Sequence, residues 1–80
     1  MQYRPYGKHT NIQLSVLGFG AMRLPKDDDY AVQCMVRAIE LGVNFFDTAY
    51  GYTAGPEQTR GHSEVLVGRA LKARPREELY

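Results

Sequence analysis

Eighty residues with a formal net charge of +1 and 44% hydrophobic residues are expected to form one small domain, residues 1–80. This near-balanced charge gives no electrostatic basis for binding nucleic acid or an anionic membrane surface. The chain has no apolar stretch typical of a signal peptide or of a membrane helix, and its single cysteine, Cys34, excludes an internal disulfide and a cysteine cluster for zinc. We therefore expect a cytoplasmic protein without a metal site.

The start of the chain has the pattern of a β-hairpin. Residues 3–6 are short and aromatic, residues 7–11 have the composition of a turn, and residues 12–16 alternate apolar and polar side chains. Residues 16–20 follow as an apolar stretch with two glycines. We expect this stretch to be a buried strand.

A helix is expected next, over residues 30–41, because apolar side chains recur there at helical spacing. Asp28 or Asp29 is expected to cap its N-terminus, and Gly42 to end it. The apolar residues 43–46 then predict a second buried strand.

The second half of the chain repeats this order. A polar loop is expected over residues 53–62, Ser63 is expected to cap a second helix that Pro75 ends, and residues 78–80 resemble the opening of a third strand. Strands and helices alternating through short links predict right-handed βαβ units in a parallel sheet. Two and a half units bury neither face of such a sheet, so we expect the N-terminal part of a larger α/β domain. The alternative, a complete small module, would leave apolar strand faces and a sheet edge exposed.

Residues 47–52 (DTAYGY) are the main candidates for chemistry, because they follow the second apolar strand, where barrel enzymes carry catalytic groups. Asp47 comes directly after two phenylalanines, and its carboxylate either caps the turn or pairs with a catalytic group. Tyr52 could transfer a proton only if a nearby ammonium moved its pKa toward neutrality. Tyr50 is the rival candidate, and a packing role is open for both tyrosines.

Gly18 and Gly20 suggest a nucleotide loop, but the dinucleotide fingerprint needs a third glycine where Arg23 stands. The two glycines either let a flat ring approach the main chain or merely permit tight packing. His9 and His62 lie far apart in turns, without metal-ligand spacing, and are expected at the surface.

Together, residues 43–52 (VNFFDTAYGY) and 63–72 (SEVLVGRALK) resemble the N-terminal signature of the aldo/keto reductase family. Residues 17–24 (LGFGAMRL) look like its first barrel strand and loop, and residues 3–8 (YRPYGK) are similar to its N-terminal hairpin. The resemblance implies a (β/α)8 TIM barrel, of which this chain is the N-terminal hairpin and about two and a half β/α units. It also implies reduction of small carbonyl substrates, aldehydes or ketones, to alcohols with NADPH, or less often NADH.

The resemblance further implies a catalytic tetrad of Asp, Tyr, Lys and His. Asp47 matches the Asp, and Tyr52, five residues later, matches the proton-donating Tyr, whereas Tyr50 falls in a variable position. Asp47 is also expected to reach the nicotinamide ribose. The loop beside that ribose is matched by Gly20, Ala21, Met22 and Arg23.

The Lys and His of the tetrad are expected on later strands, the Lys a few residues beyond Tyr80, so the 80 residues alone are expected to be inactive. The loop over residues 53–62 is longer than in compact members of the family. The alternative function is a non-catalytic binding or regulatory protein on the same fold, in which no lysine follows the third strand.

Overall fold

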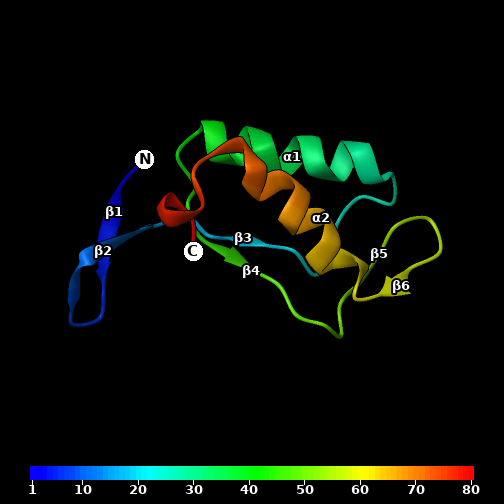
Figure 1. Cartoon of the computed structure of the whole chain (residues 1–80), viewed down its shortest axis with the longest axis horizontal. Coiled ribbons are helices and arrows are strands. Elements are labelled where there is room, and N and C mark those ends of the chain that lie inside the picture. Colours follow the sequence, from blue (N-terminus) through cyan, green and yellow to red (C-terminus); the bar gives the residue numbers. More distant parts are fainter.

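The computed structural model describes residues 1–80 as two helices, three pairs of short strands and two short 3-10 helices (Figure 1). The elements are β1 (Tyr3–Tyr6), β2 (His9–Ser15), β3 (Phe19–Gly20), α1 (Asp28–Glu40), β4 (Phe46–Asp47), β5 (Thr53–Ala54), β6 (Thr59–Arg60), α2 (His62–Ala70), η1 (Leu71–Ala73) and η2 (Arg76–Glu78). Neither helix is long and apolar enough to cross a membrane.

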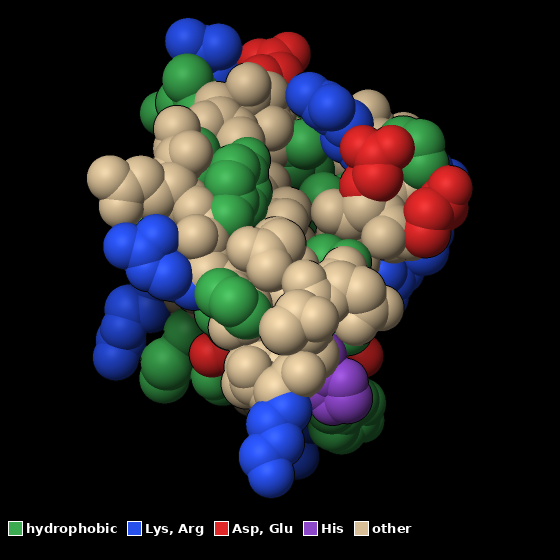
Figure 2. Space-filling view, turned by 90° about the vertical axis from the view of Figure 1, so that its left-hand side faces the viewer, with side chains coloured by type: hydrophobic (Ala, Val, Ile, Leu, Met, Phe, Trp, Pro, Cys, Tyr) green, Lys and Arg blue, Asp and Glu red, His purple; other side chains and the backbone are tan.

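The predicted N-terminal hairpin is confirmed, with β1 and β2 antiparallel and Tyr3 opposite Ser15. The turn is shorter than predicted: Gly7, at φ 56°, and Lys8 suffice to reverse the chain, so residues 9–11 belong to β2. The hairpin projects from one end of the molecule (Figure 1). Viewed from that end, basic and acidic side chains are interspersed rather than gathered by sign (Figure 2).

Polar contacts attach the hairpin to the rest of the chain. The Tyr3 hydroxyl donates to the carbonyl oxygen of Gly42 at 2.7 Å. The Asn44 side chain accepts from the Ser15 backbone N–H and donates to the Gln13 carbonyl oxygen, both at 2.8 Å. One amide side chain therefore continues the backbone pairing of β2 toward β4.

A parallel sheet forms the centre, as predicted. β3 pairs with β4 in parallel, with Phe19 opposite Phe46 and Gly20 opposite Asp47. On the other side of β4, the Tyr80 N–H donates to the Asn44 carbonyl at 2.7 Å and the Phe46 N–H donates to the Tyr80 carbonyl at 2.8 Å. This alternation of bonds is that of a parallel ladder, so Tyr80 lies beside β4. Of residues 78–80, predicted to open a third strand, Glu78 instead ends the 3-10 helix η2.

The strands are shorter and less buried than predicted. Within residues 16–20 only Phe19 and Gly20 are strand, and Val16 and Leu17 are 59% and 62% exposed. Phe45 is also exposed, while its neighbour Phe46 is buried. The side chains of Phe45 and Phe46 point to opposite faces, as successive strand residues do, and here the helices cover only one face.

The core lies between this sheet and the two helices, which pack against each other. From α1 it takes the buried side chains Ala31, Met35 and Ile39. From α2 it takes Leu66, Val67 and Ala70. The chain is thus a small α/β piece with an open sheet, not a closed barrel.

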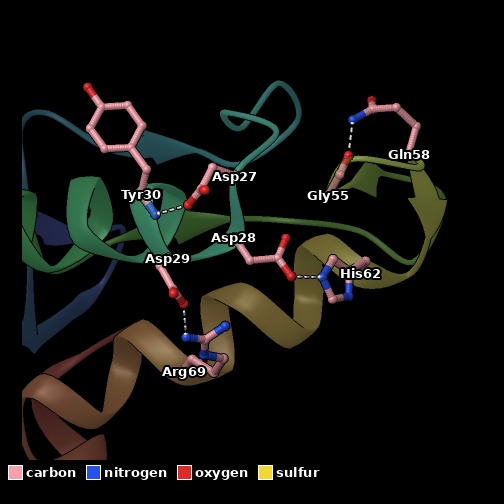
Figure 3. Close-up of polar contacts among 8 residues, drawn as sticks. All are labelled: Asp27, Asp28, Asp29, Tyr30, Gly55, Gln58, His62 and Arg69. Atoms are coloured by element: carbon pink, nitrogen blue, oxygen red, sulfur yellow. Dashed lines mark hydrogen bonds and ion pairs between the residues drawn. The ribbon is translucent and has the colours of Figure 1, made fainter.

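Helix α1 is capped by Asp27, not by Asp28 or Asp29 as predicted. The Asp27 carboxylate accepts from the Tyr30 backbone N–H at 2.9 Å (Figure 3). The helix ends before Gly42, as predicted, and φ 104° at this residue explains why glycine occupies it.

The helix α2 and the loop before it also differ from the prediction. The N-cap of α2 is Gly61, at φ 83° and with no side-chain capping bond, and Ser63 lies two residues later, in the first turn, fully buried. The segment predicted as a plain polar loop, residues 53–62, contains the β5–β6 hairpin. A tight turn around Gly55, at φ 82°, allows the two strands to pair.

Candidate active site

Two segments distant in sequence meet at the C-terminal ends of the parallel strands. Gly20, which ends β3, is the register partner of Asp47, which ends β4. The Ala21 backbone N–H donates to the Asp47 carbonyl oxygen at 2.9 Å, so the pairing continues into the loops. The loop predicted to lie beside a cofactor, residues 20–23, therefore adjoins the predicted catalytic segment, residues 47–52.

The Asp47 side chain is exposed, and its carboxylate makes no hydrogen bond or ion pair within the chain. It does not cap the turn, which was one of the two readings of this residue. It is also less enclosed by apolar groups than the preceding phenylalanines suggested, because Phe46 points into the core while Asp47 points away from it.

Tyr52 is half-buried, and its backbone is held at both ends. Its N–H donates to the Ala49 carbonyl oxygen, and its own carbonyl accepts from the Gly61 N–H, both at 3.1 Å. No hydrogen bond joins the Tyr52 hydroxyl to Asp47. Tyr50 is 70% exposed, with its ring beside Gly61. Of the two tyrosines, Tyr52 is the one whose position the backbone fixes.

The two glycines before the first loop have different surroundings. A Cβ added to Gly18 would lie 2.7 Å from the Phe45 ring, so a side chain at this position would require the ring to move. A Cβ added to Gly20 would meet no atom within 4 Å. The main chain at Gly20 is therefore open to an approaching ring, which fits a planar cofactor group at this position. The neighbouring Met22 and Arg23 are exposed, whereas Ala21 is fully buried.

Sequence reasoning missed the contribution of Ser63 to this region. Its hydroxyl donates to the Ala21 carbonyl oxygen at 2.8 Å and lies 3.0 Å from the Thr48 hydroxyl. The sequence did show a serine directly before a regular apolar helix face, but this pattern was interpreted as a helix cap.

His62 was expected at the surface, yet it is half-buried and bonded. Its Nε2 lies 2.8 Å from an oxygen of Asp28, which ties the start of α2 to the start of α1 (Figure 3). Two turns further along α2, Arg69 pairs with Asp29 at 2.9 Å. No group of three or more His, Cys, Asp or Glu side chains is arranged to hold a metal ion.

Comparison with known proteins bears directly on this region. A family model described as "Aldo/keto reductase family" matches residues 16–80. The chain belongs to the aldo/keto reductase family. This confirms the resemblance inferred from the sequence motifs, and it makes the chain part of a family of oxidoreductases.

Three curated relatives have sequence identities between 35% and 39%. "Uncharacterized oxidoreductase YqkF" of Bacillus subtilis is 35% identical over 65 residues, which is 81% of this chain and 19% of the relative. "L-galactose dehydrogenase" of Arabidopsis thaliana is 39% identical over 72 residues, 81% of this chain and 20% of the relative. "NADH-specific methylglyoxal reductase" of Escherichia coli is 35% identical over 78 residues, 88% of this chain and 22% of the relative.

A solved structure, the thermostable aldo-keto reductase Tm1743 in complex with the inhibitor epalrestat, matches 100% of this aldo/keto reductase chain and 29% of its own chain. The TM-score is 0.77 at 30% sequence identity. The described α/β piece is therefore part of the aldo-keto reductase TIM-barrel fold. The chain spans about a fifth of the length of the curated relatives it matches.

Proposed function

We propose that the protein carrying this chain reduces aldehydes or ketones to alcohols with NADPH or NADH, and that residues 1–80 are the N-terminal portion of its single barrel domain. The observation that carries the proposal is the parallel pairing of Gly20 with Asp47. This pairing brings two loops to the C-terminal edge of the sheet. The loop of residues 20–23 has an open main chain, and the loop of residues 47–52 carries a free carboxylate and a tyrosine whose backbone is held by hydrogen bonds. Active sites of TIM-barrel enzymes lie at this edge.

The cofactor assignment rests on the family and on the surroundings of Gly20. A bound nicotinamide would supply the hydride that reduces the carbonyl carbon. Gly20, with no neighbour within 4 Å of an added Cβ, and the following residues 21–23 would lie beside the nicotinamide ribose. The carboxylate of Asp47 is free to accept hydrogen bonds from ribose hydroxyls, since it has no partner within the chain. The E. coli relative is named for NADH specificity, which supports a nicotinamide cofactor.

Tyr52 is proposed to hold the proton that the carbonyl oxygen receives, at its hydroxyl oxygen. An ammonium group beside this hydroxyl would stabilise the phenolate left behind, and Asp47 would pair with that ammonium. The family resemblance assigns the ammonium to a lysine and the orientation of the substrate to a histidine, both from later strands. The 80 residues alone are therefore proposed to be inactive.

The test is turnover by the full-length gene product. We expect the protein to oxidise NADPH or NADH when a small aldehyde is added, followed by the absorbance of the reduced nicotinamide. Tyr52→Phe should lower kcat by about 10²–10⁴-fold, the usual contribution of a positioned proton donor, and leave the dissociation constant of the cofactor unchanged. Tyr50→Phe is the matched control, because it removes the same hydroxyl from an exposed position two residues away. Wild-type turnover by Tyr52→Phe would refute the assigned role.

A further inference from the structure

The chain contains only two buried polar side chains, Ser15 and Ser63, and they lie at opposite ends of the parallel sheet. Ser63 is 0% exposed and belongs to the first turn of α2. The N-cap position is taken by Gly61, so the hydroxyl of Ser63 is not used to cap the helix. Because a buried hydroxyl costs free energy unless it is bonded, the partners of Ser63 define what it does.

The hydrogen-bond directions around Ser63 follow from counting protons. The Ser63 hydroxyl has one proton, and it donates this proton to the Ala21 carbonyl oxygen at 2.8 Å. The contact of 3.0 Å with the Thr48 hydroxyl must then have Thr48 as the donor. The hydroxyls therefore form one directed chain, from Thr48 through Ser63 to Ala21.

This chain closes a ring across the two loops of the proposed site. The Ala21 N–H donates to the Asp47 carbonyl oxygen at 2.9 Å, and Asp47 is bonded covalently to Thr48. Both backbone polar groups of Ala21 are thus hydrogen-bonded, the N–H to Asp47 and the carbonyl oxygen to Ser63. The ring fixes the spacing between the loop of residues 20–23 and Asp47, the last residue of β4. The Gly61 N–H, two residues before Ser63, also holds the Tyr52 carbonyl.

We propose that Ser63 is a positioning residue of the active site, which rests on the function proposed above. It acts through Ala21 and Thr48 to hold the cofactor loop and the Asp47 segment in register, and it touches neither substrate nor cofactor. Loss of the Ser63 hydroxyl and its two hydrogen bonds allows the two loop segments to move relative to each other. A misplacement of about 1 Å can lower turnover by about 10²-fold, so the effect on catalysis should exceed the effect on stability.

Ser15 provides a matched control within the same chain. Ser15 is 4% exposed. Its hydroxyl donates to the Leu17 carbonyl oxygen at 2.7 Å and accepts from the Asn44 N–H at 3.1 Å. Ser15→Ala therefore removes an equally buried hydroxyl with the same number of bonds, but at the hairpin end of the sheet. A purely structural serine and a positioning serine should differ in kinetics and not in melting temperature.

The experiment compares Ser63→Ala with Ser15→Ala in the full-length protein by melting temperature, cofactor titration and steady-state kinetics. We expect similar losses of melting temperature for both variants. Ser63→Ala should also raise the dissociation constant of the nicotinamide cofactor and lower kcat/KM by about 10–100-fold, whereas Ser15→Ala should change neither. Equal kinetics for the two variants in an active protein would overturn the role of Ser63 alone. A wild-type protein that binds neither NADPH nor NADH would overturn the proposed function and this role with it.

Thr48 offers a second test in case Ser63→Ala does not fold. Thr48→Val removes the donor without leaving a cavity, because the two side chains have nearly the same shape. We expect the same direction of change as for Ser63→Ala, and Thr48→Ser, which keeps the hydroxyl, should restore kcat/KM. The double variant Thr48→Val with Ser63→Ala should be no worse than the more impaired single variant. Normal kinetics for Thr48→Val would contradict the proposed ring.

Discussion

Gly42 gives the sharpest test of how the N-terminal hairpin is attached. The residue follows α1 with φ 104°, a conformation that side-chain-bearing residues rarely adopt. A Cβ at this position would lie 2.9 Å from the Met1 Cβ and 2.9 Å from the Tyr3 hydroxyl oxygen. The same hydroxyl donates to the Gly42 carbonyl oxygen at 2.7 Å. Gly42→Ala should therefore strain the backbone and displace the hairpin.

The expected loss of stability has two parts. The left-handed backbone costs an alanine about 1–2 kcal/mol relative to glycine. Displacing Tyr3 removes a hydrogen bond with a net value of about 1 kcal/mol, and this is an upper value because Tyr3 is 40% exposed and water can replace the partner. Gly42→Ala should thus lower the free energy of unfolding by about 2–3 kcal/mol.

Urea unfolding of the full-length protein measures this change, and a double-mutant cycle with Tyr3→Phe separates its parts. Tyr3→Phe alone should cost about 0.5–1 kcal/mol. In the Gly42→Ala background it should cost nearly nothing, because the bond is already broken and removal of the hydroxyl relieves the close contact with the new methyl group. A change below about 0.5 kcal/mol for Gly42→Ala, or full additivity of the two substitutions, would refute this reasoning.

Two further substitution pairs test the core and the site. Leu66→Ala should lower the free energy of unfolding by about 2–5 kcal/mol, because Leu66 is 0% exposed in the core. Val65→Ala, at a neighbour that is 55% exposed, should change this free energy by no more than about 0.5 kcal/mol. Equal losses for the two variants in chemical denaturation would contradict the core assignment. Gly18→Ala should destabilise the protein more than Gly20→Ala, because the added methyl group would lie 2.7 Å from the Phe45 ring and displace it. Gly20→Ala should leave the melting temperature unchanged and weaken binding of the nicotinamide cofactor, and unchanged affinity in a cofactor titration would argue against a ring beside Gly20.

Local patterns in the sequence predicted the two helices, the first hairpin and the place of the candidate site. The helical spacing of apolar residues predicted α1 and α2, and the glycine after α1 predicted its end. An apolar run followed by the segment of residues 47–52 predicted that Asp47 ends a buried strand, and β4 ends there. These features depend on residues within one or two turns of each other, so periodicity and turn chemistry suffice to predict them.

Where several adjacent residues were chemically equivalent, only the tertiary structure distinguished them. The sequence predicted that Asp28 or Asp29 caps α1. In the structure Asp27 is the cap, while Asp28 and Asp29 bond to His62 and Arg69 on α2 (Figure 3). The contacts of Asp28 and Asp29 span 34 and 40 residues. Residue spacing does not predict such long-range contacts, because it does not show which face of one helix packs against the other.

The same limit applies to the candidate site itself. The sequence left two interpretations open for Gly18 and Gly20 together, the approach of a flat ring or tight packing. The position of the Phe45 ring beside Gly18, with nothing beside Gly20, distinguishes the two residues. Ser63 looked like a helix cap because capping is what a serine before an apolar helix face usually does. Its hydroxyl instead bonds to Ala21, 42 residues earlier, since folding brings the start of α2 against the ends of two parallel strands. The sequence by itself thus predicted the first hairpin, the two helices, the parallel strands and the candidate catalytic residues, and tertiary packing alone decided which side chains hold them in place.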